Sequence, residues 1–157
     1  MLPKHSPWLT VVLASIGIVA AVERVDRCGD PAVATVIGEL RAIHSAQQTF
    51  ASSCGRGGYA PSLQALRVPP RGASAGFISL ALGSEAIGYV ISVDPQDQPA
   101  ARGACRGVPV VSANFVHAEP HPGEQRPSFA MDRAGTIYIR QDGEPIPVDF
   151  EGAQRLQ

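Results

Sequence analysis

The stretch that decides the fold is DPAVATVIGELRAIHSAQQTFASSC, residues 30–54. It opens with Asp30 and Pro31, a favoured helix N-cap followed by the residue favoured at the first helical position. Apolar residues then recur at steps of three and four, which predicts an amphipathic helix of about twenty residues ending near Cys54. The apolar stripe consists of Val33, Val36, Ile37, Leu40, Ile43 and Phe50. Such a stripe is typical of a helix that packs on a sheet.

Downstream of this helix the sequence predicts a short helix and then strands. Ala60-Pro61-Ser62 is a helix start that leads into Leu63 and Leu66. The period then changes to two, which is typical of strands. The expected strands are 88–93, 108–117, 128–131 and 136–140, with a tight hairpin turn at 132–135. This order indicates an α+β domain in which the long helix covers an antiparallel sheet of about four strands.

The first 27 residues differ from the rest of the chain. Lys4 precedes an uncharged apolar run that ends at Val22 and is followed by charged residues. The predicted membrane segment contains Leu9, Val12, Leu13, Ile16, Ile18 and Val19. A helix from residue 2 to residue 25 would be ~36 Å long, enough to cross a hydrocarbon core of ~30 Å. A secretory signal peptide cut before Val22 is the alternative. A buried N-terminal helix in a cytoplasmic protein is a third interpretation.

The chain therefore divides into three parts. Residues 1–27 are the predicted membrane anchor or signal segment, residues 28–142 the predicted globular domain, and residues 143–157 a predicted flexible C-terminal tail. About 130 residues remain beyond the first segment, enough for a single core. The formal net charge is −1, so no overall field attracts polyanions, and nucleic acid is not an expected partner.

Cysteine placement favours export. The chain has three cysteines, at positions 28, 54 and 105. Cys54 and Cys105 both lie in Gly-rich loop context, which favours a disulfide between them in an oxidising compartment. That bridge would close a loop of about 51 residues and stabilise the fold by up to ~4 kcal/mol. Three unpaired thiols in a reducing compartment are the alternative, and Cys28 is free, lipidated or intermolecular.

One constellation invites a catalytic interpretation. In His117-Ala-Glu-Pro-His121, alternating His, Glu and His would share one strand face, an arrangement that suits a metal. Because Pro120 and Pro122 interrupt the strand, polar loop residues are the simpler interpretation. Asp94 and Asp97 are a second candidate, for Ca²⁺. The sequence carries no nucleophile motif and no phosphate-binding loop, so we expect no catalytic residues, no metal and no cofactor.

A series of segments, in this order, resembles the type IV pilin and type II secretion pseudopilin superfamily. The segments are Leu9-Thr-Val-Val12, Ile16-Gly-Ile-Val-Ala-Ala-Val22, Leu40-Arg-Ala-Ile-His-Ser-Ala-Gln47, Phe50-Ala-Ser52, Gly57-Gly-Tyr-Ala-Pro-Ser-Leu63, Phe77-Ile-Ser79, Gly88-Tyr-Val90 and Arg126-Pro-Ser-Phe-Ala-Met-Asp-Arg-Ala-Gly-Thr-Ile137. The chain departs from the family at His5-Ser-Pro-Trp-Leu-Thr10, which has neither the glycine before the processing site nor the glutamate of the mature helix. Processing by a prepilin peptidase is therefore not expected.

The resemblance implies a pilin-like fold, in which the hydrophobic N-terminal helix continues into the amphipathic helix. It also implies a non-enzymatic envelope protein with a single N-terminal pass through the inner membrane and a periplasmic C-terminal domain. Such a protein is a structural or accessory component of a type II secretion or type IV pilus machine and serves protein transport. Its partners would be other pilin-like subunits or secretion-machine proteins. A soluble periplasmic binding domain of the same fold, released by signal peptidase, is the alternative, and an enzyme built on the histidine loop is the third hypothesis.

Overall fold

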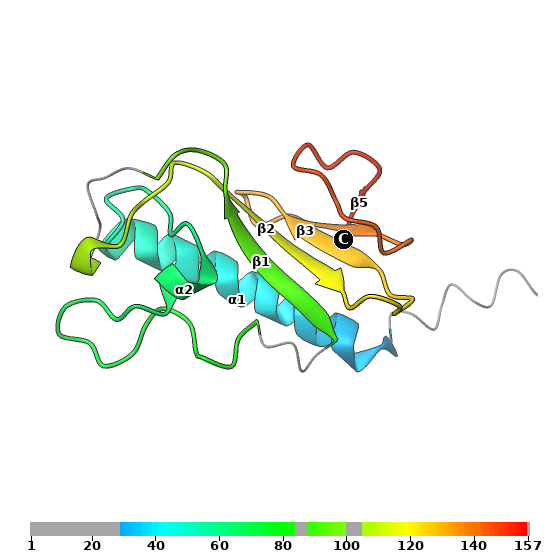
Figure 1. Cartoon of the computed structure of the whole chain (residues 1–157), viewed down its shortest axis with the longest axis horizontal. Coiled ribbons are helices and arrows are strands. Elements are labelled where there is room, and N and C mark those ends of the chain that lie inside the picture. The colour runs from blue at the N-terminus through cyan, green and yellow to red at the C-terminus, as the bar shows by residue number, and fades with distance from the viewer. Residues whose placement is uncertain (1–28, 84–87, 100–104, 157) are drawn as a thin grey trace, which may run out of the picture.

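A computed structural model describes residues 29–83, 88–99 and 105–156 of the chain (Figure 1). The predicted membrane segment, from Leu9 to Val19, lies outside the described residues. Within the part described, no helix is both long enough and apolar enough to span a bilayer.

The long helix predicted from the apolar stripe is present as α1, Pro31–Ser53. Its N-cap is Asp30, whose Oδ1 accepts the backbone N–H of Ala32 at 2.8 Å. At the other end the N–H of Cys54 donates to the carbonyl of Phe50. Both helix ends therefore lie where the sequence placed them, because local capping chemistry specifies them. The second helix, α2, is a single turn, Leu63–Leu66, capped by the hydroxyl of Ser62.

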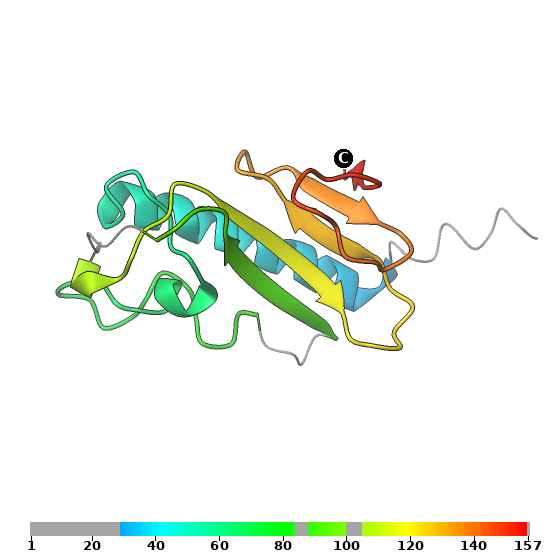
Figure 2. The ribbon, with the colours of Figure 1, turned by 45° about the horizontal axis from the view of Figure 1, so that its top comes forward.

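Within the described residues, five strands form one antiparallel sheet in the order β1-β2-β3-β4-β5 (Figures 1 and 2). The strands are β1 Tyr89–Pro95, β2 Asn114–Pro120, β3 Ser128–Met131, β4 Ile137–Arg140 and β5 Gln154–Arg155. Each strand pairs with its neighbour in sequence, so the sheet is a meander. The α+β class is confirmed, with one strand more than the four expected.

The hairpin between β3 and β4 matches its prediction closely. The Asp132 carboxylate accepts the N–H groups of Ala134 and Thr136 at 2.9 and 2.8 Å. Gly135 adopts φ +82°, which a residue with a Cβ disfavours. The turn chemistry visible in the sequence is therefore the chemistry that closes the hairpin.

The predicted bounds of β2 were wrong. The strand was expected over 108–117, but it begins at Asn114 and runs through Pro120. Residues before it turn toward the end of α1 instead, where Tyr59 and Val111 exchange N–H to carbonyl bonds of 2.8 and 3.0 Å. Pro120 is tolerated because the pairing of β2 with β3 ends at Ala118, so the strand is an edge at this position and no ladder hydrogen bond to β3 is lost.

The C-terminal segment 143–157, expected to be a flexible tail, packs across the sheet from 143 to 156 (Figure 1). Ile146 is buried against Phe115 and Ala130 on the face opposite α1, with Phe150 packed beside them. The chain then forms β5 against β4. The sheet is therefore covered on both faces, by α1 on one side and partly by this segment on the other.

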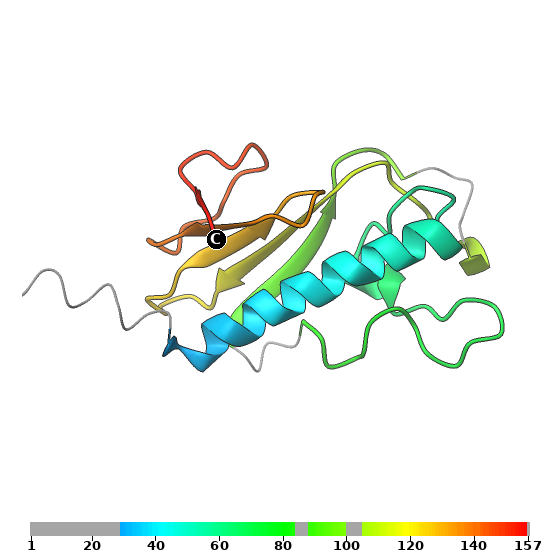
Figure 3. The ribbon, with the colours of Figure 1, turned by 180° about the vertical axis from the view of Figure 1, so that it is seen from behind.

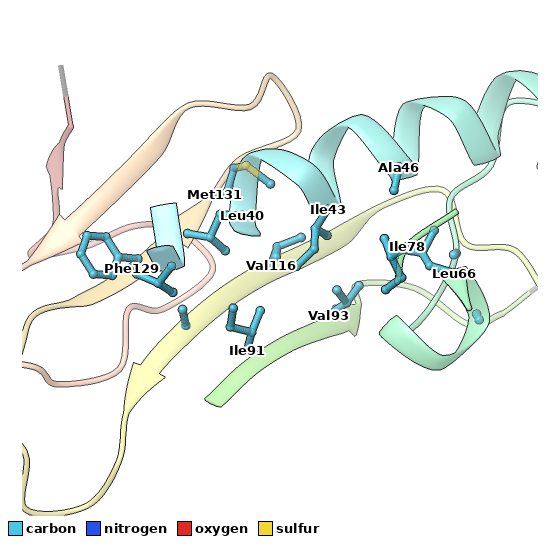
Figure 4. Packing of buried hydrophobic residues seen from close by; sticks show 14 of the residues in the cluster. Leu40, Ile43, Ala46, Leu66, Ile78, Ile91, Val93, Val116, Phe129 and Met131 are labelled. Carbon is cyan, nitrogen blue, oxygen red and sulfur yellow. The ribbon is translucent and has the colours of Figure 1, made fainter. Parts of the chain in front are cut away.

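The core lies between α1 and the sheet (Figures 3 and 4). The predicted stripe supplies it: Val36, Leu40, Ile43 and Phe50 are fully buried, Val33 nearly so, and Ile37 only partly. Opposite them lie Ile91, Val93, Val116, Phe129 and Met131. Burial of such side chains is the main stabilising contribution, at about 1.5–3 kcal/mol each.

Candidate functional site

Of the histidine constellation, His117 and Glu119 lie on β2, on the sheet face opposite α1, whereas His121 follows the end of that strand. The His117 Nε2 lies 2.8 Å from Asp94 Oδ2, and its Nδ1 lies 3.2 Å from Glu119 Oε1. The imidazole also stacks on the Phe115 ring, with centroids 5.3 Å apart. Both ring nitrogens therefore already face carboxylate oxygens, and this geometry does not present a nitrogen to a metal. In the described ranges no group of three or more His, Cys, Asp or Glu residues is placed to hold a metal ion.

The two aspartates considered for Ca²⁺ have separate partners. Asp94 faces His117, as above, whereas the Asp97 carboxylate accepts the backbone N–H of Ser112 at 2.9 and 3.1 Å. These hydrogen bonds hold the pKa of Asp97 below its usual value, because they favour the ionised form. Asp97 thus anchors the loop that precedes β2. The pair does not converge on one ligand.

Cys54, at the C-terminal end of α1, is disulfide-bonded. Residue 28 and the side chain of Cys105 lie outside what the structure describes, so the pairing of Cys54 with Cys105 stays a prediction. Geometry favours it, because residue 28 precedes a helix of 23 residues that is ~35 Å long. By contrast the short 3₁₀ turn η3, Cys105–Gly107, lies beside the end of α1 that carries Cys54 (Figures 1 and 3).

A pocket that sequence reasoning missed lies against the second half of α1. It is small, and its walls come from α1, the turn after it, the start of β2 and the β3–β4 turn. The lining residues are His44, Gln47, Gln48, Tyr59, Asn114, Val116, Met131, Asp132 and Arg133. The Asn114 side-chain nitrogen is buried and has no hydrogen-bond partner. No local pattern signals this site, because the chain brings its walls together from distant segments.

Gln47 builds one wall of this pocket and also holds the turn that follows α1. Its Nε2 donates to the carbonyl of Ala60 and its Oε1 accepts the N–H of Ala60, both at 2.9 Å. Gln47 is 2% exposed, and Ala60 is fully buried. The side-chain amide of Gln47 thus makes both backbone hydrogen bonds of Ala60, in the way that the backbone of an adjacent β-strand does. This contact fixes the position of Tyr59 and of the Gly-rich turn before it.

At the opposite end of α1 a charged cluster ties the helix to the β2–β3 loop. Asp30 Oδ2 accepts Arg126 Nε at 2.9 Å, while Arg126 Nη1 also contacts Glu124. The phenol of Tyr89 donates to the carbonyl of Pro127 at 3.1 Å. Burial raises the pKa of Tyr89 to about 12. These are structural contacts, and the Asp30 carboxylate serves both as helix cap and as ion-pair partner.

The exposed face of α1 is made of small and polar side chains. Beyond Pro31 at its start, the exposed positions are Ala34, Thr35, Gly38, Arg41, Ala42, Ser45, Gln48, Thr49, Ser52 and Ser53. A Cβ built on Gly38 would meet nothing within 4 Å. Another helix could therefore approach this face closely.

Comparisons with known proteins add no relative. No protein-family model matches the chain, and neither a curated protein nor a solved structure is significantly similar to it.

Proposed function

We propose that this chain is a non-enzymatic, pilin-like envelope protein. Its N-terminal apolar segment anchors it in the inner membrane, and the domain from residue 28 onward lies in the periplasm. There it serves as a structural or accessory component of a type II secretion or type IV pilus machine. Its partners are other pilin-like subunits or proteins of that machine.

The observation that carries the proposal is the order of elements around α1. The helix begins at Pro31, with eight residues between it and the end of the uncharged apolar run at Val22. Among the described residues it packs directly on one face of an antiparallel meander. A long helix that follows an apolar segment and lies on one face of such a sheet is the arrangement expected of a pilin-like subunit.

Two further observations support it. Cys54 is disulfide-bonded, and structural disulfides persist in oxidising compartments such as the bacterial periplasm. Gly38 and Ala42, on the exposed face of α1, have small side chains, and small residues let helix backbones approach closely. Both fit an exported subunit that packs against its neighbours through a helix.

The test is the mature N-terminus together with membrane fractionation. The full chain would be expressed in a Gram-negative host, fractionated, and its intact mass measured. An intact chain that requires detergent for extraction supports the proposal. A soluble periplasmic chain beginning at Val22 would refute anchoring and favour the alternative, a soluble periplasmic binding domain.

A matched pair of variants sharpens this experiment. Leu13→Asp places a charge inside the apolar run, where it disfavours membrane insertion by about 2.5–3.5 kcal/mol. Leu80→Asp changes the same residue type at an exposed position of the domain, 83% accessible. We expect only the first variant to leave the membrane fraction. Equal behaviour of both variants would contradict an anchor at residues 1–27.

A further inference from the structure

Residues 143–156, which cover part of the sheet face opposite α1, are packed less tightly than the rest of the domain (Figure 2). We call them the C-terminal arm. Ile146 is the only buried residue of the arm, and most of the others are exposed. It lies in a small cluster with Phe115 and Ala130, separate from the core between α1 and the sheet. In native proteins, segments with few buried apolar contacts are the ones that open locally.

A few further contacts attach the arm to β4. The Phe150 ring stacks on that of Tyr138, with centroids 4.2 Å apart. The Leu156 N–H donates to the carbonyl of Ile137 at 2.8 Å, next to the two residue pairs that join β4 and β5. The Leu156 side chain is partly buried and packs against the core. None of these contacts takes part in the pairing of β1 through β4, so that pairing remains when the arm detaches.

The backbone at Phe150 opposes this attachment. Phe150 has φ +61°, in the left-handed region, which is disfavoured for a residue with a bulky side chain. The strain persists because the stack on Tyr138 and an edge-on contact with Phe115, at 5.7 Å between centroids, hold the residue in place. When the arm detaches, Phe150 relaxes to an ordinary conformation, and this release favours the detached state.

The arm leaves β4 through a turn that requires glycine. Gly143 has φ +77°, and a Cβ built on it would lie 2.6 Å from the carbonyl oxygen of Arg126. Beside this turn the Ser128 hydroxyl donates to the carbonyl of Glu144. These contacts hold the start of the arm, so the turn is the place where a substitution loosens the arm without touching the core.

We propose that the C-terminal arm detaches as one unit while α1 and strands β1 to β4 stay folded, and that the sheet face it uncovers binds the arm of a second copy of the chain. The structure shows what fits there: an aliphatic side chain against Phe115 and Ala130, an aromatic ring on Tyr138, and a backbone that pairs with β4. Each copy carries an arm with these features, so exchange between two copies restores every contact that detachment breaks. The inference does not depend on membrane anchoring.

Amide hydrogen exchange of the full chain in neutral detergent, followed by NMR, tests detachment. The N–H groups of Phe150, Ala153 and Leu156 donate to the carbonyls of Pro147, Phe150 and Ile137, respectively. We expect these three amides to share one protection factor, at least about 100-fold below that of the β3 amides. Protection that falls stepwise from Phe150 to Leu156 would indicate fraying and contradict detachment as a unit. Protection equal to that of β3 would show that the arm opens only with the whole domain, and would also overturn the proposal.

Gly143→Ala and Gly123→Ala form a matched pair of variants. Both glycines have positive φ, +77° and +90°, so alanine carries a similar backbone penalty at either position. Nothing lies within 4 Å of the Cβ position at Gly123, in the β2–β3 loop, so only at Gly143 does the added Cβ meet the chain. Gly143→Ala should lower the protection of the three arm amides about tenfold and leave that of β3 unchanged. An equal effect of Gly123→Ala on the arm, or an equal loss of protection at β3, would contradict a separate opening of the arm.

Binding of a second arm is tested with a fluorescein-labelled peptide of residues 143–156, followed by fluorescence anisotropy. Because the chain's own arm fills the site except in the detached fraction, Gly143→Ala should bind the peptide about tenfold more tightly than the unchanged chain does. The control is a peptide with Ile146→Asp, which places a charge in the apolar cluster and should not bind. Absence of binding to Gly143→Ala, or equal binding of the control peptide, would overturn the exchange. Membrane fractionation measures only the N-terminal segment, so failure here leaves the proposed function standing.

Discussion

Replacement of Gln47 by methionine should destabilise the domain far more than the same replacement one residue later. Methionine keeps the length of the side chain but removes both hydrogen bonds to Ala60, each 2.9 Å long. Ala60 is fully buried, so its N–H and carbonyl would be left without partners or water. An unsatisfied buried donor or acceptor costs about 1–3 kcal/mol, and two together give an expected loss of about 2–6 kcal/mol.

The neighbouring Gln48 is the matched control, because it is exposed and makes no side-chain hydrogen bond within the described residues. Gln48→Met should change the free energy of unfolding by less than about 0.5 kcal/mol. Urea unfolding of the oxidised full chain, followed by circular dichroism, compares the two variants. Equal losses in both variants, or a loss below 1 kcal/mol for Gln47→Met, would refute the role assigned to the Ala60 contact.

The remaining predictions concern the helix cap, a buried phenol and the hairpin turn. Asp30→Ala should cost about 1–2 kcal/mol of unfolding free energy, since it removes the N-cap and a partly buried ion pair with Arg126. Asp30→Asn keeps the cap and should cost less, and equal losses in the two variants would contradict the capping role. The pKa of Tyr89 rises to about 12 in the folded state, so its neutral phenol contributes to the free energy of unfolding. This contribution is fully present below pH 10 and is lost as the pH rises from 10 to 12. A spectrophotometric titration of Tyr89→Phe against the unchanged chain checks it, and identical alkaline profiles would count against it. Gly135→Ala should lower the free energy of unfolding by about 1–2 kcal/mol, because Gly135 has φ +82° and an added Cβ would lie 2.9 Å from the His44 ring. Gly38→Ala, at an exposed position of α1, should raise the free energy of unfolding slightly.

Local chemistry explains which parts of the fold the sequence could predict. The bounds of α1 follow from Asp30, Pro31 and the periodic stripe, all within one stretch of chain. The β3–β4 turn follows equally from Asp132 and Gly135. In each case the residues that specify the structure are neighbours in sequence, so the pattern alone is informative.

The errors arise where distant segments compete for the same partner. Residues 108–113 alternate as a strand does, yet Val111 pairs with Tyr59 and β2 starts only at Asn114. β5 has two residues and leaves no periodic signal. The pocket around Asn114 forms only when α1, the turn after it, the start of β2 and the β3–β4 turn are all packed together. Such pairings are set by tertiary packing, which a single sequence does not display.

The two ends of α1 are secured in different ways, and this difference has a mechanical consequence. Asp30 holds the first turn through hydrogen bonds and an ion pair, which break and re-form readily, whereas Cys54 holds the last turn through a covalent bond. A pulling force applied at residue 29 would therefore act first on the Asp30–Arg126 ion pair and the Asp30 cap. If these contacts break, the Cys54 disulfide still holds the other end of the helix. The first turn of α1 can therefore detach under force and re-form its contacts when the force is removed.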